Sequence, residues 1–83
     1  MKVNKRLNQA VLEVVENQIR HLNPPATKET LDRLLREGHS EDEARRLIGC
    51  VVASEIFDIL KAMQPYDEDR YVAALRNLPE LPE

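Results

Sequence analysis

The 83-residue sequence contains little that could cross-link a small domain: one cysteine, Cys50, and two histidines, His21 and His39. A single cysteine excludes an intrachain disulfide and suits a reduced cytosol. The three residues form no Cys-x-x-Cys or His-x-x-x-His pair, and no base lies close to Cys50 in the sequence. We therefore expect no metal, no cofactor and no nucleophilic catalysis.

Glycines, aromatic residues and long apolar runs are also scarce. The two glycines, Gly38 and Gly49, are too few for a phosphate-binding loop. The longest uncharged apolar run, Leu47–Ala53, is far shorter than the roughly 18 residues that a membrane span needs. No apolar segment follows the first basic residues, as it would in a signal peptide. We expect a cytoplasmic protein that does not enter a membrane.

The residues that are present indicate one helical domain. Hydrophobic residues make up 42% and charged residues 33%, with a formal net charge of −3, which is too apolar a mixture for a disordered chain. The length fits a single domain covering residues 1–83. Helical spacing runs along most of the chain, and strand-like alternation is nearly absent. We predict an all-α, four-helix bundle-like domain with helices at about 4–22, 27–37, 41–63 and 67–77.

Several residues between these helices are typical start and stop signals. Pro24 and Pro25 end the first helix, because proline cannot continue it. Thr27 is predicted to cap the second helix, and Gly38 to end it in a left-handed conformation. Ser40 caps the third helix, where Glu43 completes a Ser-x-x-Glu capping box. The side of the first helix expected to face the core carries Leu7, Val11, Val14, Val15 and Leu22.

The third helix has more apolar surface than one face requires. Its main apolar arc spans roughly 220°, about twice the stripe of an ordinary surface helix. That arc contains Leu47, Ile48, Val51, Val52, Ile56, Ile59, Leu60 and Met63. A second strip, formed by Cys50, Ala53 and Phe57, lies on the other side at spacings i, i+3 and i+7. We predict a helix buried nearly all round.

Two arrangements would bury such a helix: a monomer in which it is central, or a pair of chains. Core area is scarce in 83 residues, so we favour a homodimer with Cys50, Ala53 and Phe57 at the interface and Phe57 near the two-fold axis. An unidentified protein partner stays open. The leading functional hypothesis is a non-enzymatic helical interaction module that self-associates.

Two polar residues interrupt the apolar faces: Gln18 in the first helix and Glu55 in the third. A lone buried carboxylate is costly, so Glu55 should be hydrogen-bonded, protonated or directed into a wet interface. The amide of Gln18 is one candidate partner, and Tyr71 is another. We interpret Gln18 and Glu55 as an internal polar tie. The alternative is a small-molecule-binding or enzymatic site that uses Glu55, although spacing supplies no second catalytic group.

The second and third helices also resemble a helix-turn-helix, with Leu34, Gly38 and Ala44 at suitable spacing. The would-be recognition helix begins with three carboxylates, at residues 41–43, where DNA phosphates and base edges would be met. Nucleic acid is therefore not an expected partner, and a DNA-binding regulator is kept only as an alternative function.

Several segments resemble a family of short, all-helical bacterial proteins of unknown function. They are residues 13–20, Asn23-Pro24-Pro25, Thr27–Leu34, Glu37-Gly38, Glu41–Ile48, Ala53–Leu60, Pro-Tyr-Asp at 65–67 and Arg-Tyr at 70–71. The resemblance implies a bacterial, cytoplasmic protein and no catalytic activity.

Overall fold

The computed structural model describes residues 5–82, with side chains from residue 8 onward, and this part of the chain forms four helices and no strand. The helices are α1 (Lys5–His21), α2 (Pro25–Arg36), α3 (Glu41–Ala62) and α4 (Glu68–Asn77). The predicted all-α, bundle-like fold is confirmed. The predicted first helical residue, Asn4, lies outside the described residues, and the other predicted ends fall within two residues of the observed ones.

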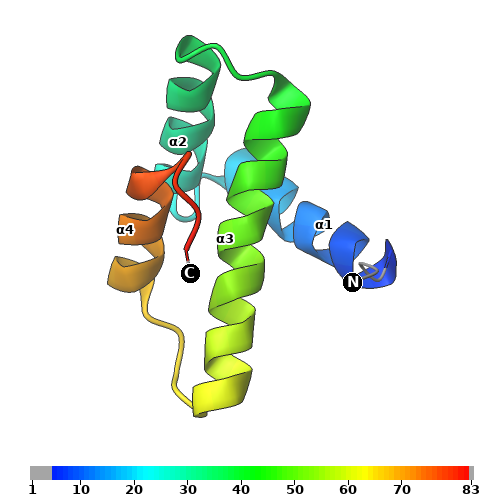
Figure 1. The fold of residues 1–83 in the computed structure, drawn as a ribbon, viewed down its shortest axis with the longest axis vertical. Helices are drawn as coiled ribbons and strands as arrows, with labels where there is room; N and C mark the ends of the chain where they lie inside the picture. The colour runs from blue at the N-terminus through cyan, green and yellow to red at the C-terminus, as the bar shows by residue number, and fades with distance from the viewer. Residues whose placement is uncertain (1–4, 83) are drawn as a thin grey trace.

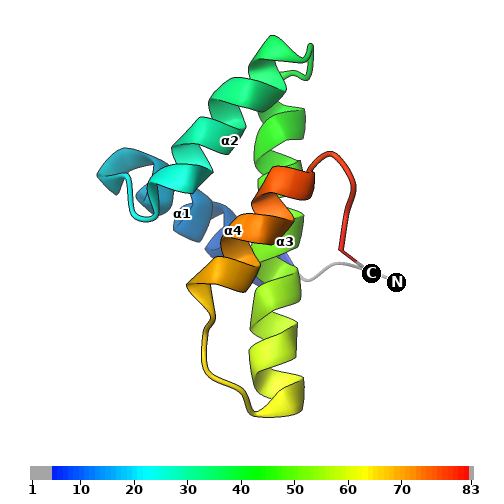
Figure 2. The same cartoon turned by 90° about the vertical axis from the view of Figure 1, so that its left-hand side faces the viewer.

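The long helix α3 contacts all three other helices. The helices α2 and α4 lie along one side of it, whereas α1 crosses behind it (Figure 1). In the view turned by 90°, α4 lies across the middle of α3, and the last turns of α3 extend beyond the other helices (Figure 2). The C-terminal tail runs back alongside α3 (Figure 1).

The start of α2 differs from the prediction. The helix begins at Pro25, and Pro24 occupies the N-cap position without a side-chain cap. Proline suits the first helical position because its φ is preset and its missing N–H is not needed there. Thr27 is therefore not the cap: it is fully buried in the first turn, and its hydroxyl donates to Oε1 of Gln18 at 2.8 Å.

The turn from α2 to α3 follows the sequence signals. Gly38 has a φ of +99°, and the N–H groups of Gly38 and His39 donate back to the carbonyls of Leu35 and Leu34, both at 3.1 Å. These two bonds form a Schellman motif, which satisfies the last carbonyls of α2. The prediction that Gly38 ends the second helix in a left-handed conformation is confirmed.

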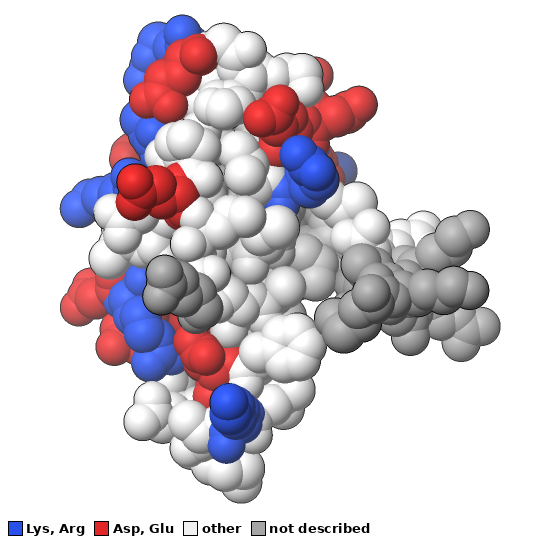
Figure 3. Space-filling view, in the orientation of Figure 1, with Lys and Arg blue, Asp and Glu red and all other residues white. Residues whose placement is uncertain are grey.

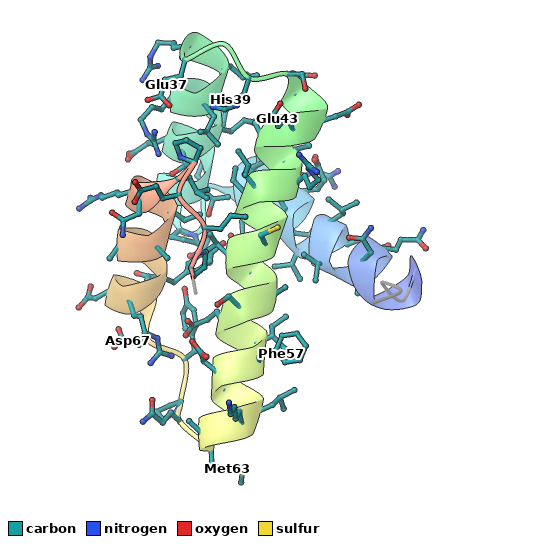
Figure 4. All side chains as sticks on the ribbon, in the orientation of Figure 1. Glu37, His39, Glu43, Phe57, Met63 and Asp67 are labelled. Atoms are coloured by element: carbon teal, nitrogen blue, oxygen red, sulfur yellow. The ribbon has the colours of Figure 1, made fainter. Side chains whose placement is uncertain are left out.

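The capping box at the start of α3 is only half formed. Oγ of Ser40 accepts from the N–H of Glu43 at 3.1 Å, as expected of an N-cap. The carboxylate of Glu43 does not return to the Ser40 N–H; it lies 2.9 Å from Nδ1 of His39 (Figure 4). The predicted reciprocal bond was therefore wrong, because the neighbouring imidazole takes the carboxylate.

The core lies where the four helices meet. Its buried apolar residues are Val11, Val15, Leu31, Leu34, Ala44, Leu47, Ile48, Val51, Val52, Tyr71, Leu75 and Leu78. Two residues predicted to face inward are exposed: Val14 by 37% and Leu22 by 54%. Leu22 follows the end of α1 at a φ of 53°, and Val14 is not part of the core cluster. The side chain of Leu7 lies outside the described part.

Gly49 marks the place where α1 and α3 approach each other closely. It is buried, and a Cβ at this position would lie 3.3 Å from Cγ1 of Val11. Glycine in a helix interior costs about 1 kcal/mol relative to alanine. The contact offsets that cost, because a side chain at position 49 would crowd Val11. Val11 is buried, and its β-branched side chain has little rotamer freedom to move away.

We predict that the effect of Gly49→Ala depends on Val11. In the wild-type chain, the gain of about 1 kcal/mol in helix propensity is offset by crowding, so the free energy of unfolding changes little. In a Val11→Ala background the crowding is gone, and Gly49→Ala should stabilise by about 1 kcal/mol. Urea unfolding of the wild type, the two single variants and the double variant measures the coupling between the two positions. An equal gain in both backgrounds would show that the contact is unimportant.

Candidate functional site

Among the described residues, other parts of the chain cover only the first two thirds of α3. Its buried residues are Ala44, Leu47, Ile48, Gly49, Val51, Val52 and Glu55. Beyond Glu55 the large apolar side chains become accessible: Phe57 is 61% exposed, Leu60 69% and Met63 88%. Within the single chain these last two turns are therefore accessible, and burial of this helix nearly all round stays a prediction that a second copy would have to fulfil. A helical wheel gives the direction of a side chain around the axis but not its position along it. The helices α2 and α4 do not extend along α3 as far as these turns (Figures 1 and 2).

The predicted interface residues lie together on the uncovered side of α3. Cys50 is exposed and free, Ala53 is half-buried against the edge of the core, and Phe57 points away from α2 and α4 (Figure 4). Leu60 continues the same line three residues after Phe57. We call Cys50, Ala53, Phe57 and Leu60 the outer strip.

Sequence reasoning missed two residues of this surface, because Leu60 and Met63 were placed in the inward-facing arc. The signal that identifies Leu60 is its spacing: positions 50, 53, 57 and 60 follow intervals of three, four and three. Met63 follows the last helical residue with a φ of 54° and lies at the tip of the molecule (Figure 4).

The surface around the outer strip carries little charge. Figure 3 shows few charged side chains down the middle of this face; they gather mainly over α2, α4 and the start of α3, with a few near the end of α3. The ion pair between Arg45 and Glu16 fixes the orientation of α1, because it turns the Glu16 side of α1 toward the start of α3. Val14 lies on the opposite side of α1 and therefore faces the end of α3 that carries Phe57.

Glu55 lies at the other side of α3 and is bound by an arginine. It is 8% exposed, and its two carboxylate oxygens accept from Nη2 of Arg70 at 2.6 Å and Nε at 3.2 Å. This hydrogen bond raises the pKa of Arg70 above its ordinary value. A carboxylate held in this two-point geometry is a structural link between α3 and α4, since both of its oxygens are occupied.

Gln18 is bound to different partners. Its Oε1 accepts from the hydroxyl of Tyr71 at 2.7 Å and from that of Thr27 at 2.8 Å. Among the described residues, then, Gln18 and Glu55 take separate partners and do not bond to each other; Tyr71, one of the candidates named for Glu55, bonds Gln18. Burial is the main cause that raises the pKa of Tyr71 to about 12.

Together these contacts hold the short helix α4. Gln18 of α1 bonds Tyr71, and Glu55 of α3 bonds Arg70. From α2, Nη2 of Arg33 donates to the carbonyl of Leu75 at 3.1 Å, near the C-terminal end of α4. Each of the other helices therefore supplies one polar side chain to α4. A ten-residue helix is marginal alone, so these contacts and its buried face stabilise it.

The structure offers little to a small ligand near Glu55. Two open depressions of about 520 and 510 Å³ occur, the first lined by residues 64–70 and the second by the outer face of α1 between Gln9 and Arg20. Arg70 borders the first depression, but Glu55 lines neither. Among the described residues, no group of three His, Cys, Asp or Glu side chains is placed to hold a metal ion.

The resemblance to a helix-turn-helix is not accompanied by a basic surface at the start of α3. Glu41 and Asp42 are exposed there. Arg45, which follows them, is engaged by Glu16 and lies 3.8 Å from Glu41.

Comparisons with protein-family models, with curated proteins and with solved structures find no match for this chain. Within residues 5–82, none of the helices combines the length and the apolar character needed to cross a membrane. The function of this surface is therefore inferred from its geometry alone.

We predict that ionisation of Tyr71 destabilises the fold at high pH. The pKa of Tyr71 is about 12 in the folded chain and 10.0 when exposed. The neutral phenol therefore contributes its full share to the free energy of unfolding below pH 10, and that share is lost as pH rises through 12. The difference in free energy of unfolding between wild type and Tyr71→Phe should fall by about 2 kcal/mol over that range. Urea titrations at several pH values measure it. A difference that is constant with pH would contradict the assignment.

Proposed function

We propose that the protein is a non-enzymatic helical interaction module that self-associates as a homodimer through the outer strip. The observation that carries this proposal is the exposure of Phe57 and Leu60, by 61% and 69%, on a face of α3 that carries few charged side chains. Contiguous exposed apolar surface of this kind is typical of protein interaction sites. Resemblance to short bacterial proteins and the lone Cys50 further support a bacterial, cytoplasmic protein.

Association through this face has a clear physical benefit. Fully burying a leucine, phenylalanine or methionine side chain contributes about 1.5 to 3 kcal/mol each. In a symmetric pair, each such residue is buried twice. That gain must exceed the loss of rigid-body freedom on association, so an aromatic anchor such as Phe57 is expected to carry much of the binding energy.

The other two functional hypotheses gain no support from the geometry. An enzymatic or ligand-binding role for Glu55 would require a free carboxylate, but Arg70 occupies both of its oxygens. A DNA-binding role would require a basic recognition surface, but Glu41 and Asp42 stand at the start of α3.

We predict that Phe57→Ala weakens self-association without unfolding the chain. Because Phe57 is 61% exposed, its removal leaves the core intact. Each chain of the dimer loses an aromatic anchor of about 2 kcal/mol, so the total loss of about 4 kcal/mol should raise the dimer Kd about a thousandfold. Sedimentation velocity over a concentration series measures the Kd, and thermal unfolding checks the fold.

The matched control is Tyr66→Ala, which removes an aromatic side chain of similar exposure, 50%, in the connection before α4. It should leave the dimer Kd unchanged. A wild-type chain that sediments as a 9.6 kDa species at all concentrations would overturn the proposed self-association.

A further inference from the structure

The outer strip has the spacing of a helix-pairing seam. Intervals of three, four and three residues between positions 50, 53, 57 and 60 match the repeat by which two helices pack along their length. The buried residues of α3, such as Ile48 and Val52, occupy the other side of the helix and are used by the core. The helix α3 thus carries two apolar seams, and the described residues of its own chain fill only one.

We propose that two copies of this chain pair their α3 helices in antiparallel orientation along the outer strip. In this pairing, Ala53 packs against the partner's Phe57, and Cys50 against the partner's Leu60. The pairing rests on the proposed self-association and specifies its geometry. The two-fold axis passes near position 55, midway between the paired residues.

The order of side-chain sizes supports the antiparallel orientation. The two residues nearer the start of the strip, Cys50 and Ala53, are small, and the two nearer its end, Phe57 and Leu60, are large. Antiparallel packing places each large residue against a small one in both halves of a symmetric interface. Parallel packing would place the two alanines opposite each other next to two opposed phenylalanines, which leaves a gap beside a crowded layer.

The charge at the start of the strip supports the same orientation. Arg46 lies four residues before Cys50, continues its spacing and is exposed. No ion pair holds it within the described part of the chain. Antiparallel pairing places Arg46 beside the last carbonyls of the partner's α3, where the helix dipole favours a cation. Parallel pairing would bring two arginines together.

The place where α1 approaches α3 lies next to the outer strip. Gly49, which a Cβ would bring against Val11 of α1, directly precedes Cys50 in the chain. Val14 lies on the side of α1 opposite Glu16 and is 37% exposed. A helix seated along the outer strip would therefore contact α1 as well as α3.

The single native cysteine gives a direct test by oxidative crosslinking. We predict that Leu60→Cys forms a covalent dimer through Cys50 and the new cysteine of the partner, detected on a non-reducing gel. Wild type should form none, because Cys50 and the partner's Cys50 are separated by about 15 Å along the helices. A disulfide requires Cα atoms within about 7 Å, so positions 50 and 60 of one chain are also too far apart to bridge.

Two further chains complete the crosslinking experiment. Asp58→Cys, at an exposed position turned by about 120° from the centre of the strip, should crosslink poorly. Leu60→Cys with Cys50→Ser should not crosslink, because position 60 faces position 50. A disulfide in wild type, or in this double variant, would overturn the antiparallel orientation and leave self-association standing. A dimer by sedimentation in which Leu60→Cys fails to crosslink would place the interface elsewhere, and a monomer would overturn both proposals.

We predict that Arg46→Glu raises the dimer Kd about three- to tenfold at low salt, with a smaller effect at 0.5 M salt, because it places a carboxylate at the negative end of the partner's helix. Arg36→Glu makes the same charge change at an exposed site on α2 and should leave the Kd unchanged. An equal effect of both substitutions would show that net charge, and not this contact, matters. A Kd that Arg46→Glu leaves unchanged would favour the parallel orientation, in which two glutamates replace two arginines and repel each other equally.

Discussion

The mismatch in length between α3 and the helices that pack on it is the constraint on which the structure depends. With 22 residues, α3 is about 33 Å long, whereas the 12 residues of α2 span about 18 Å and the ten of α4 about 15 Å. The shorter helices cover α3 only as far as Glu55. The exposure of Phe57, Leu60 and Met63 follows from this difference, and so does the case for a second chain.

The short length of α4 likewise explains why polar contacts are needed to anchor it. A helix of ten residues buries only Tyr71 and Leu75 within its span, with Leu78 just beyond it. Polar contacts from each neighbour complete its anchoring, and among the described side chains no buried polar atom is left without a partner. Removing one member of such a contact would leave a buried group unsatisfied, so these residues act in the fold more than in any chemistry.

The sequence predicted features governed by local chemistry and failed where distant contacts decide. Gly38 and Ser40 behave as expected, because helix ends depend on residues within one turn. The prediction that Thr27 caps the second helix was wrong because α2 begins earlier, at Pro25. The Thr27 hydroxyl instead donates to Gln18, nine residues away in the sequence. Tyr71, which bonds Gln18, and Arg70, which bonds Glu55, lie on α4, and no spacing rule brings that helix to them. The strip at Cys50, Ala53 and Phe57 was identified by direction, but its extension through Leu60 required knowing where coverage of α3 ends.

The central claim is that the chain itself protects the first part of α3 and a second copy protects the last part. Amide hydrogen exchange of the wild-type protein across a concentration series tests this claim most directly. Protection of residues 57–62 should rise with protein concentration, whereas protection around Ile48 and Val52 should stay constant. Protection of residues 57–62 that does not change over a hundredfold range of concentration would contradict the account.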